Sequence, residues 1–177
     1  MTTQKLTFYP FKNEYFEMVI QWLKKLHVRE YYYGEGLDNT ISNLELYKNG
    51  IRDNGRYFFD FWVACIQEKP FGLLMTSPIS GPYDPEDPYD KWFQDGKEII
   101  TLDLLIGEEN YLGKGLGQRM IREFLLEKCS QVSTVLIDPE IKNTRAIHVY
   151  EKVGFKKVEQ FFPSHNPAPH WMMYLEI

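Results

Sequence analysis

The sequence has few cysteines and no long apolar run, and both absences exclude classes of protein. Its two cysteines, Cys65 and Cys129, lack the spacing of a zinc site or of a disulfide framework. We expect them to be reduced thiols in a protein core. No stretch approaches the roughly 20 apolar residues of a membrane-spanning helix. The first residues also lack the apolar segment of a secretory signal peptide. These features favour a cytoplasmic protein without membrane contact.

Positive charge is also in short supply. The chain has 20 lysines and arginines against 25 aspartates and glutamates, a formal net charge of −5. This balance argues against binding to nucleic acid or to an anionic membrane, and it suits a small cationic ligand. The content of 44% hydrophobic and 25% charged residues is that of a folded domain rather than a disordered chain. We expect one domain over residues 1–177, as a monomer or a homodimer.

One stretch, residues 98–155, has the most regular pattern in the chain. A near-continuous apolar run at 99–106 predicts a strand, and a glycine turn at 112–117 precedes a periodic helix. A second apolar strand follows at 132–137, and a second helix at 143–153 ends before a glycine. Free N–H groups at a glycine-rich helix start, together with the helix dipole, favour bound phosphate.

The glycine turn, L-G-K-G-L-G, does not match the two best-known phosphate motifs. A P-loop requires Ser or Thr after its lysine, whereas Gly115 follows Lys114. The dinucleotide fingerprint GxGxxG is broken because Met120 stands at the third glycine position. A flexible loop before a helix remains the plain alternative for this turn alone.

The combined pattern is more specific. Strand, L-G-K-G-L-G turn, helix, strand and then N-x-R-A-x-x-x-Y-x-K-x-G-F at 143–155 resembles the GNAT superfamily of acetyl-CoA-dependent N-acetyltransferases. The resemblance implies an α/β fold with a mixed, mostly antiparallel sheet of six to seven strands, flanked by helices and with splayed central strands. It implies acetyl-CoA as cosubstrate and no metal. The implied cofactor-binding residues are Leu105, Ile106, Gly113, Lys114, Gly115, Leu116, Gly117, Gln118, Asn143 and Ala146.

Two side chains of this unit are candidates for catalysis. Asp103 is a single acid in an apolar strand, and burial raises the pKa of a carboxyl toward the range of a general base. A structural hydrogen bond to a neighbouring strand is the alternative for Asp103. The resemblance places Tyr150 near the thioester sulfur, where its hydroxyl would protonate the departing thiolate. Core packing is the alternative for Tyr150.

Within the superfamily, the chain most resembles aminoglycoside 6′-N-acetyltransferases. Those enzymes have an aspartate before the L-G-K-G-L-G turn, an Asp-Pro like that at 138–139, and a Glu-aromatic-aromatic segment like that at 30–32. The loop at 78–96 carries five acids and one base, which suits a polycationic ligand, although a solvated acidic loop is equally simple. The predicted substrate-binding residues are Tyr31, Tyr32, Asp84, Glu86, Asp87, Asp90, Trp92, Asp95 and Asp138.

The predicted function is therefore acetylation of the 6′-amino group of aminoglycosides. Two alternatives stay open: a GNAT enzyme for another amine or hydroxylamine, such as a polyamine or a siderophore precursor, and a non-catalytic acyl-CoA-binding module. Two further expectations concern local features. His165 and His170 are interpreted as incidental, and a second N-terminal helix is expected to begin at Asn39 or Thr40.

Overall fold

A computed structural model describes residues 4–81 and 84–177. Its centre is a seven-stranded sheet in the order β1-β2-β3-β4-β5-β7-β6. Only β4 and β5 run parallel to each other among these neighbours, and the remaining pairs are antiparallel. This confirms the predicted α/β fold. The strands are β1 (Leu6–Pro10), β2 (Asp60–Ile66), β3 (Lys69–Pro78), β4 (Glu98–Ile106), β5 (Val132–Ile137), β6 (Lys156–Phe161) and β7 (His170–Glu176).

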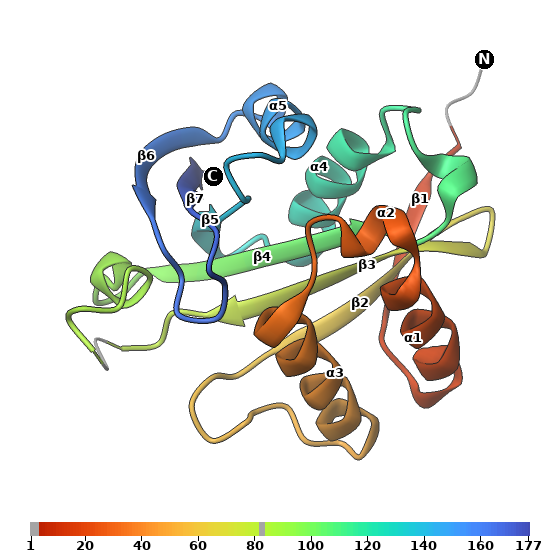
Figure 1. The fold of residues 1–177 in the computed structure, drawn as a ribbon, viewed down its shortest axis with the longest axis horizontal. Helices are drawn as coiled ribbons and strands as arrows, with labels where there is room; N and C mark the ends of the chain where they lie inside the picture. Colours follow the sequence, from red (N-terminus) through yellow and green to blue (C-terminus); the bar gives the residue numbers. More distant parts are fainter. Residues whose placement is uncertain (1–3, 82–83) are drawn as a thin grey trace.

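Helices cover both faces of the sheet (Figure 1). One face carries α1 (Phe16–Lys24), α2 (Leu26–Arg29) and α3 (Gly34–Lys48), and the other carries α4 (Leu116–Lys128) and α5 (Thr144–Val153). The prediction that a helix begins at Asn39 or Thr40 is wrong, because α3 already begins at Gly34. Burial of Leu37 and Leu44 against the sheet outweighs the low helix propensity of the glycines in its first turn.

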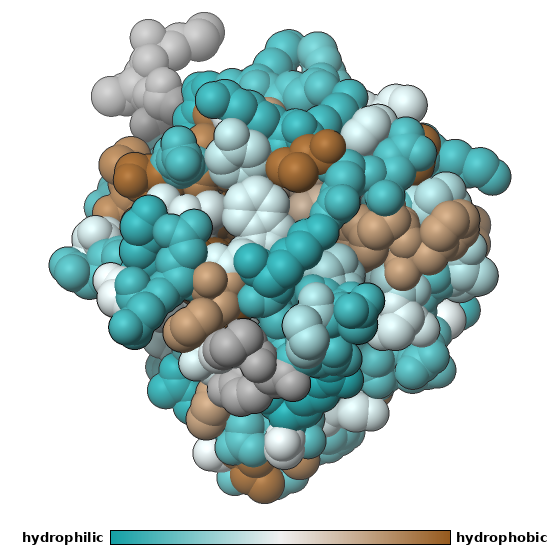
Figure 2. Space-filling view, turned by 90° about the vertical axis from the view of Figure 1, so that its left-hand side faces the viewer, coloured by the Kyte–Doolittle hydropathy of each residue, from teal (hydrophilic) through white to brown (hydrophobic). Residues whose placement is uncertain are grey.

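Two apolar clusters fill the space between the helices and the sheet. Successive side chains of a strand point to opposite faces, so Phe61 and Val63 of β2 pack with α1 and α3, while Ala64 packs with α4. Cys65 and Cys129 are free and buried, as predicted. Figure 2 shows the side that carries β6 and the loop between β3 and β4, where the surface is mostly hydrophilic and apolar side chains form separate small groups.

The central strands part along their length. The parallel pairing of β4 with β5 covers four positions and ends at Thr101 and Leu136. The pairing of β4 with β3 continues to Gly72 and Ile106. The last part of β4 therefore has an open edge on its β5 side, in the middle of the sheet.

Candidate active site

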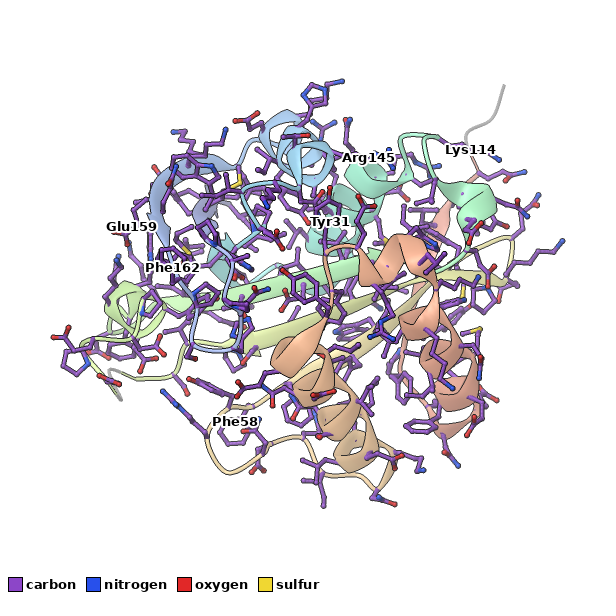
Figure 3. The ribbon with its side chains drawn as sticks, in the orientation of Figure 1. Tyr31, Phe58, Lys114, Arg145, Glu159 and Phe162 are labelled. Atoms are coloured by element: carbon purple, nitrogen blue, oxygen red, sulfur yellow. The ribbon has the colours of Figure 1, made fainter. Side chains whose placement is uncertain are left out.

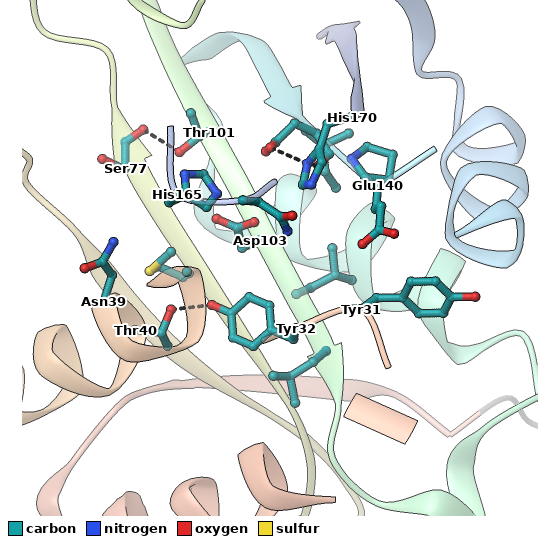
Figure 4. A pocket seen from close by; sticks show the side chains of 18 of the residues that line it. Tyr31, Tyr32, Asn39, Thr40, Ser77, Thr101, Asp103, Glu140, His165 and His170 are labelled. Atoms are coloured by element: carbon teal, nitrogen blue, oxygen red, sulfur yellow. Dashed lines mark hydrogen bonds and ion pairs between the residues drawn. The ribbon is translucent and has the colours of Figure 1, made fainter. Parts of the chain in front are cut away.

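A cavity of about 990 Å³ lies where β4 and β5 part. Its wall is formed by the ends of these strands, the first turns of α3 and α5, and the loops beside them. Cavities of roughly 300–1,000 Å³ are typical of small-molecule sites. Figure 4 shows Tyr32, Asp103, Glu140 and His170 gathered around this space, although they come from four separate segments of the chain.

Asp103 lies on β4 with its half-buried side chain in the cavity wall. It shares its strand face with Leu105, which packs in the cluster beneath α1 and α3. Burial raises the pKa of Asp103 from its ordinary 3.8 to about 7, and the charge of Asp138 acts in the same direction, while His170 opposes it. A carboxyl with this pKa can exchange a proton near neutral pH.

Tyr150 lies on α5 and lines the same cavity. Its ring packs at a tilt on Phe155, with 6.0 Å between the ring centroids. Burial raises the pKa of Tyr150, and the charges of Asp103 and Asp138 raise it further. The hydroxyl therefore keeps its proton and can donate a hydrogen bond to a group in the cavity.

Alternate residues of β4 direct their backbone N–H and C=O groups toward one neighbouring strand and then the other. An antiparallel ladder alternates residues that bond across it with residues whose groups point away. At both ends of the β3–β4 ladder the odd-numbered residues of β4 bond across: Ile79 N–H donates to Ile99 O, and Gly107 N–H donates to Phe71 O, each at 2.8 Å. Leu105 therefore directs its N–H and C=O at β3, and the prediction that its backbone binds a cosubstrate is wrong.

The same alternation turns the backbone groups of Leu104 and Ile106 to the open edge beside β5, and both residues line the cavity. His27 Nε2 lies 2.9 Å from the carbonyl oxygen of Ile106. The edge therefore presents groups that can pair with an extended amide-containing ligand, as an added strand would.

The glycine turn forms the start of α4. Gly113 and Gly115 have φ of +72° and +71°, a left-handed conformation that favours glycine. Gly115 is the N-cap residue, so the first N–H groups of this 13-residue helix are free to bind an anion. Leu116 is buried and can offer only its backbone, while Gly117 lines the cavity. Lys114 is exposed and Gln118 half-buried, and neither lines the cavity.

The start of α5 faces the cavity through Asn143 and Ala146. Asn143 also has a structural role that the motif did not reveal, because its Oδ1 accepts a bond from Ala146 N–H at 3.1 Å and caps the helix. Arg145 lies next to them on the cavity wall. Figure 3 shows Arg145 and Lys114 on the side of the sheet that carries α4 and α5.

Some of the predicted substrate-binding residues line the cavity and others do not. Tyr31, Tyr32, Asp87, Asp90 and Asp138 lie in the cavity wall, whereas Asp84, Glu86, Trp92 and Asp95 do not. Positions 82 and 83 lie outside the described residues.

Residues on both sides of this division have local partners. Asp90 accepts a bond from Asp84 N–H at 2.9 Å, and Asp87 accepts bonds from the N–H groups of Tyr89 and Asp90. The ring of Trp92 packs on Tyr174 of β7, with 5.4 Å between centroids. Several acids of the loop before β4 therefore shape its turns, as short polar side chains often do.

Two side chains in the cavity wall, Glu140 and His170, were missed by sequence reasoning. They are 8% and 7% exposed, and Glu140 accepts a bond from the Tyr33 hydroxyl at 3.0 Å. The interpretation of His170 as incidental rather than as a ligand does not include one contact that the structure adds, because its ring bonds to Asp138. Only the register of β7 beside β5 brings His170 to Asp138, and no short motif encodes that register.

A family model described as an acetyltransferase (GNAT) domain matches residues 13–162. A solved aminoglycoside N(6′)-acetyltransferase from Legionella pneumophila is 36% identical, with a TM-score of 0.83, and the match covers 99% of this chain and 94% of that one. A curated relative, aminoglycoside N(6′)-acetyltransferase type 1 of Klebsiella pneumoniae, is 27% identical over 156 residues, which are 85% of this chain and 74% of the relative.

Two further matches bear on ligands. Spermine/spermidine N(1)-acetyltransferase of Bacillus subtilis is 26% identical over 133 residues, covering 67% of this chain and 82% of the relative. An aminoglycoside acetyltransferase solved with coenzyme A shares the fold, at 23% identity and a TM-score of 0.77, over 97% of this chain and 95% of that one. Within the described residues there is no group of three metal-ligating side chains placed to hold an ion, and no helix that could span a membrane.

Proposed function

Because this chain belongs to the GNAT family of N-acetyltransferases, we propose that it transfers the acetyl group of acetyl-CoA to the 6′-amino group of aminoglycosides in the cytoplasm. One observation carries the proposal. The cavity at the parted strands combines a carboxyl that titrates near neutral pH, Asp103, with two further carboxylates, Asp138 and Glu140. Such a cavity attracts a ligand with several ammonium groups and can remove a proton from one of them.

The residues present fit acetyl-CoA. The open edge of β4 at Leu104 and Ile106 matches the amide groups of pantetheine, and the start of α4 after Gly115 suits the pyrophosphate. When bound there, acetyl-CoA supplies an activated acyl carbon in its thioester.

Asp103 and Tyr150 then have separate roles in the acetyl transfer. The Asp103 carboxylate accepts a proton from the ammonium group of the acceptor, which leaves a neutral amine able to attack the acyl carbon. The Tyr150 hydroxyl donates a hydrogen bond or a proton to the sulfur as the C–S bond breaks. The rigid cavity holds the two reactants together, which supplies much of the remaining acceleration.

The acceptor side also favours hydroxyl groups. Asn39, Thr40, Ser42 and Asn43 of α3 line the cavity, where Thr40 is bonded to the Tyr32 hydroxyl and Asn43 to Asn54. Polar side chains such as Asn39 and Ser42 can pair with hydroxyls, which aminoglycosides carry in number and polyamines lack. This feature supports an aminoglycoside over a polyamine, even though polyamine acetyltransferases are among the relatives.

Turnover with separate acceptors tests the proposal. We would measure the thiol released from acetyl-CoA with kanamycin, tobramycin, spermidine and N-hydroxylysine, and locate the acetyl group on the product by NMR. We expect turnover at micromolar kanamycin with acetylation at the 6′ position, and its loss in Asp103→Asn. Faster turnover of spermidine or N-hydroxylysine than of kanamycin would show that the acceptor is a polyamine or a hydroxylamine rather than an aminoglycoside. Binding of acetyl-CoA without turnover of any amine would indicate a non-catalytic module.

A further inference from the structure

His170 is a buried ring in the cavity wall that the proposed mechanism does not use. Its Nδ1 lies 2.6 Å from the carbonyl oxygen of Asp138 and 3.0 Å from that residue's carboxylate Oδ2. Both oxygens are acceptors, so Nδ1 carries the hydrogen and donates it. Within the part of the chain that the structure describes, Nε2 is buried without a hydrogen-bond partner. The ring therefore has one firm attachment, which is Asp138.

The backbone fixes the ring where it stands. Trp171 N–H donates to Pro139 O at 3.0 Å, and Ile141 N–H donates to Pro169 O at 2.9 Å. These two bonds flank the bridge between His170 and the segment after β5. The start of β7 and the residues around Asp138 are therefore held as one unit. A ring held in this way is suited to orient a carboxylate.

Several charged or titratable groups face His170. Asp138 and Glu140 approach from the segment after β5, and the His165 ring lies with its centroid 6.4 Å away. Asp103 acts on it from β4 at longer range. Burial lowers the pKa of His170, but the hydrogen bonds and the charge of Asp138, with a smaller effect of Glu140, outweigh burial and raise it.

Burial raises the pKa of Tyr89, on the loop before β4, and the charge of Asp138 raises it further, so the phenol lies near this carboxyl. Asp138 is thus held by the His170 ring and has the Tyr89 phenol nearby. Among the described residues, Asp103 has no side-chain hydrogen bond to a ring or a phenol, and burial keeps its pKa high. Two neighbouring carboxyls are therefore placed in unequal surroundings: Asp138 has a hydrogen-bonded ring beside it, and Asp103 does not.

We propose that His170 is a positioning residue: its ring holds the Asp138 carboxylate in a fixed direction, so that Asp103, which has no such partner, is the carboxyl that takes the proton from the acceptor amine. The proton balance is simple, because the ammonium becomes an amine as the Asp103 carboxylate becomes a carboxylic acid. His170 keeps its protons throughout. The inference rests on the proposed function of this cavity.

Two substitutions separate the hydrogen bond from the charge. In His170→Asn, the side-chain amide can reach the place of Nδ1 and keep a donor for Asp138, but it cannot become a cation. In His170→Ala, both the bond and the charge are removed. His148→Asn is the matched control, since His148 is exposed on α5 and does not line the cavity.

The first readout is the pH profile of kcat/KM with kanamycin. His170 lowers the pKa of Asp103, so removing its charge raises that pKa, and the acidic limb should move up by about one pH unit in both variants. Activity lost at neutral pH should return at higher pH in His170→Asn, because the donor to Asp138 is kept. A uniform loss of rate with an unmoved profile in both variants would overturn the inference and leave His170 a structural residue.

The second readout needs no acceptor. Carboxyl ¹³C and imidazole ¹⁵N NMR titrations should show the Asp103 midpoint moving up in His170→Asn, and the His170 midpoint moving down in Asp138→Asn. Unmoved midpoints in both variants would overturn the inference. Should the wild type turn over no amine while these midpoints move, the proposed function fails and the positioning by His170 stands. Should the wild type turn over kanamycin while neither readout moves, only the role of His170 fails.

Discussion

The carboxyl of Asp103 is expected to destabilise the folded protein at neutral pH. A pKa raised from 3.8 to about 7 corresponds to on the order of 4 kcal/mol of preference for the protonated form. We take this as an upper figure, because Asp103 is half-buried and lines a cavity. The substitution Asp103→Asn keeps the shape of the side chain and removes its charge. It should therefore make the protein more stable and the enzyme inactive, a trade-off common at active sites.

Because the pKa of Asp103 is raised in the folded protein, the stability difference between wild type and Asp103→Asn depends on pH. Below about pH 4 the Asp103 carboxyl is protonated in both folded and unfolded chains, and it contributes no difference between wild type and variant. As pH rises from about 4 toward 7, the unfolded chain releases the proton while the folded chain retains it. The wild type loses stability relative to Asp103→Asn over this window, and the loss is complete above the folded pKa.

Urea unfolding at about pH 4 and pH 8 measures the effect. We expect similar midpoints for wild type and Asp103→Asn at the lower pH, and a higher midpoint for the variant at the upper pH. Asp95→Asn is the control, because Asp95 is exposed and outside the cavity wall, and it should match the wild type at both. Equal midpoints at pH 8, or the same gain at both pH values, would refute the argument.

Three further substitutions test the site and its support. Tyr150→Phe should lower kcat about a hundredfold with an unchanged KM for acetyl-CoA; full activity would remove Tyr150 from the mechanism. Glu140→Gln should raise the KM for kanamycin about tenfold or more, since a charge-assisted bond is lost; an unchanged KM would show that Glu140 does not meet the acceptor. Gly107→Ala should cost about 1–3 kcal/mol in thermal unfolding, because its Cβ would lie 2.1 Å from the buried Trp22 ring; an unchanged Tm would contradict this packing.

The parts of the fold set by local pattern were predictable from the sequence. The apolar run before the glycine turn gave β4, and the left-handed positions at Gly113 and Gly115 explain why the turn needs glycine. Hydrophobic periodicity after the turn gave α4, and the final motif gave α5. Asp103 and Tyr150, which the sequence selected for catalysis, line one cavity, while their chemical roles remain predictions.

Features that depend on strand register were not predictable. The backbone direction of Leu105 depends on which residues of β4 bond to β3, and the partner of His170 depends on how β7 lies beside β5. Both pairings join segments distant in the sequence. The roles of the acids in the loop before β4 were not predictable for another reason, because composition does not distinguish an aspartate that shapes a turn from one that binds a ligand. Asp87 and Asp84 both accept backbone bonds within their own loop.

The parting of β4 from β5 also divides the sheet into two parts that are consecutive in the chain. Strands β1 to β4 form one half-sheet from residues 6–106, and β5 to β7 form the other from residues 132–176; four paired positions and a shared apolar cluster join them. An emerging chain can pair the strands of the first half before the second exists. In the finished protein, such halves can open separately at a lower free energy than global unfolding. A ligand lying along the open edge contacts both halves, so its binding would suppress their separate opening and make the domain unfold as one unit.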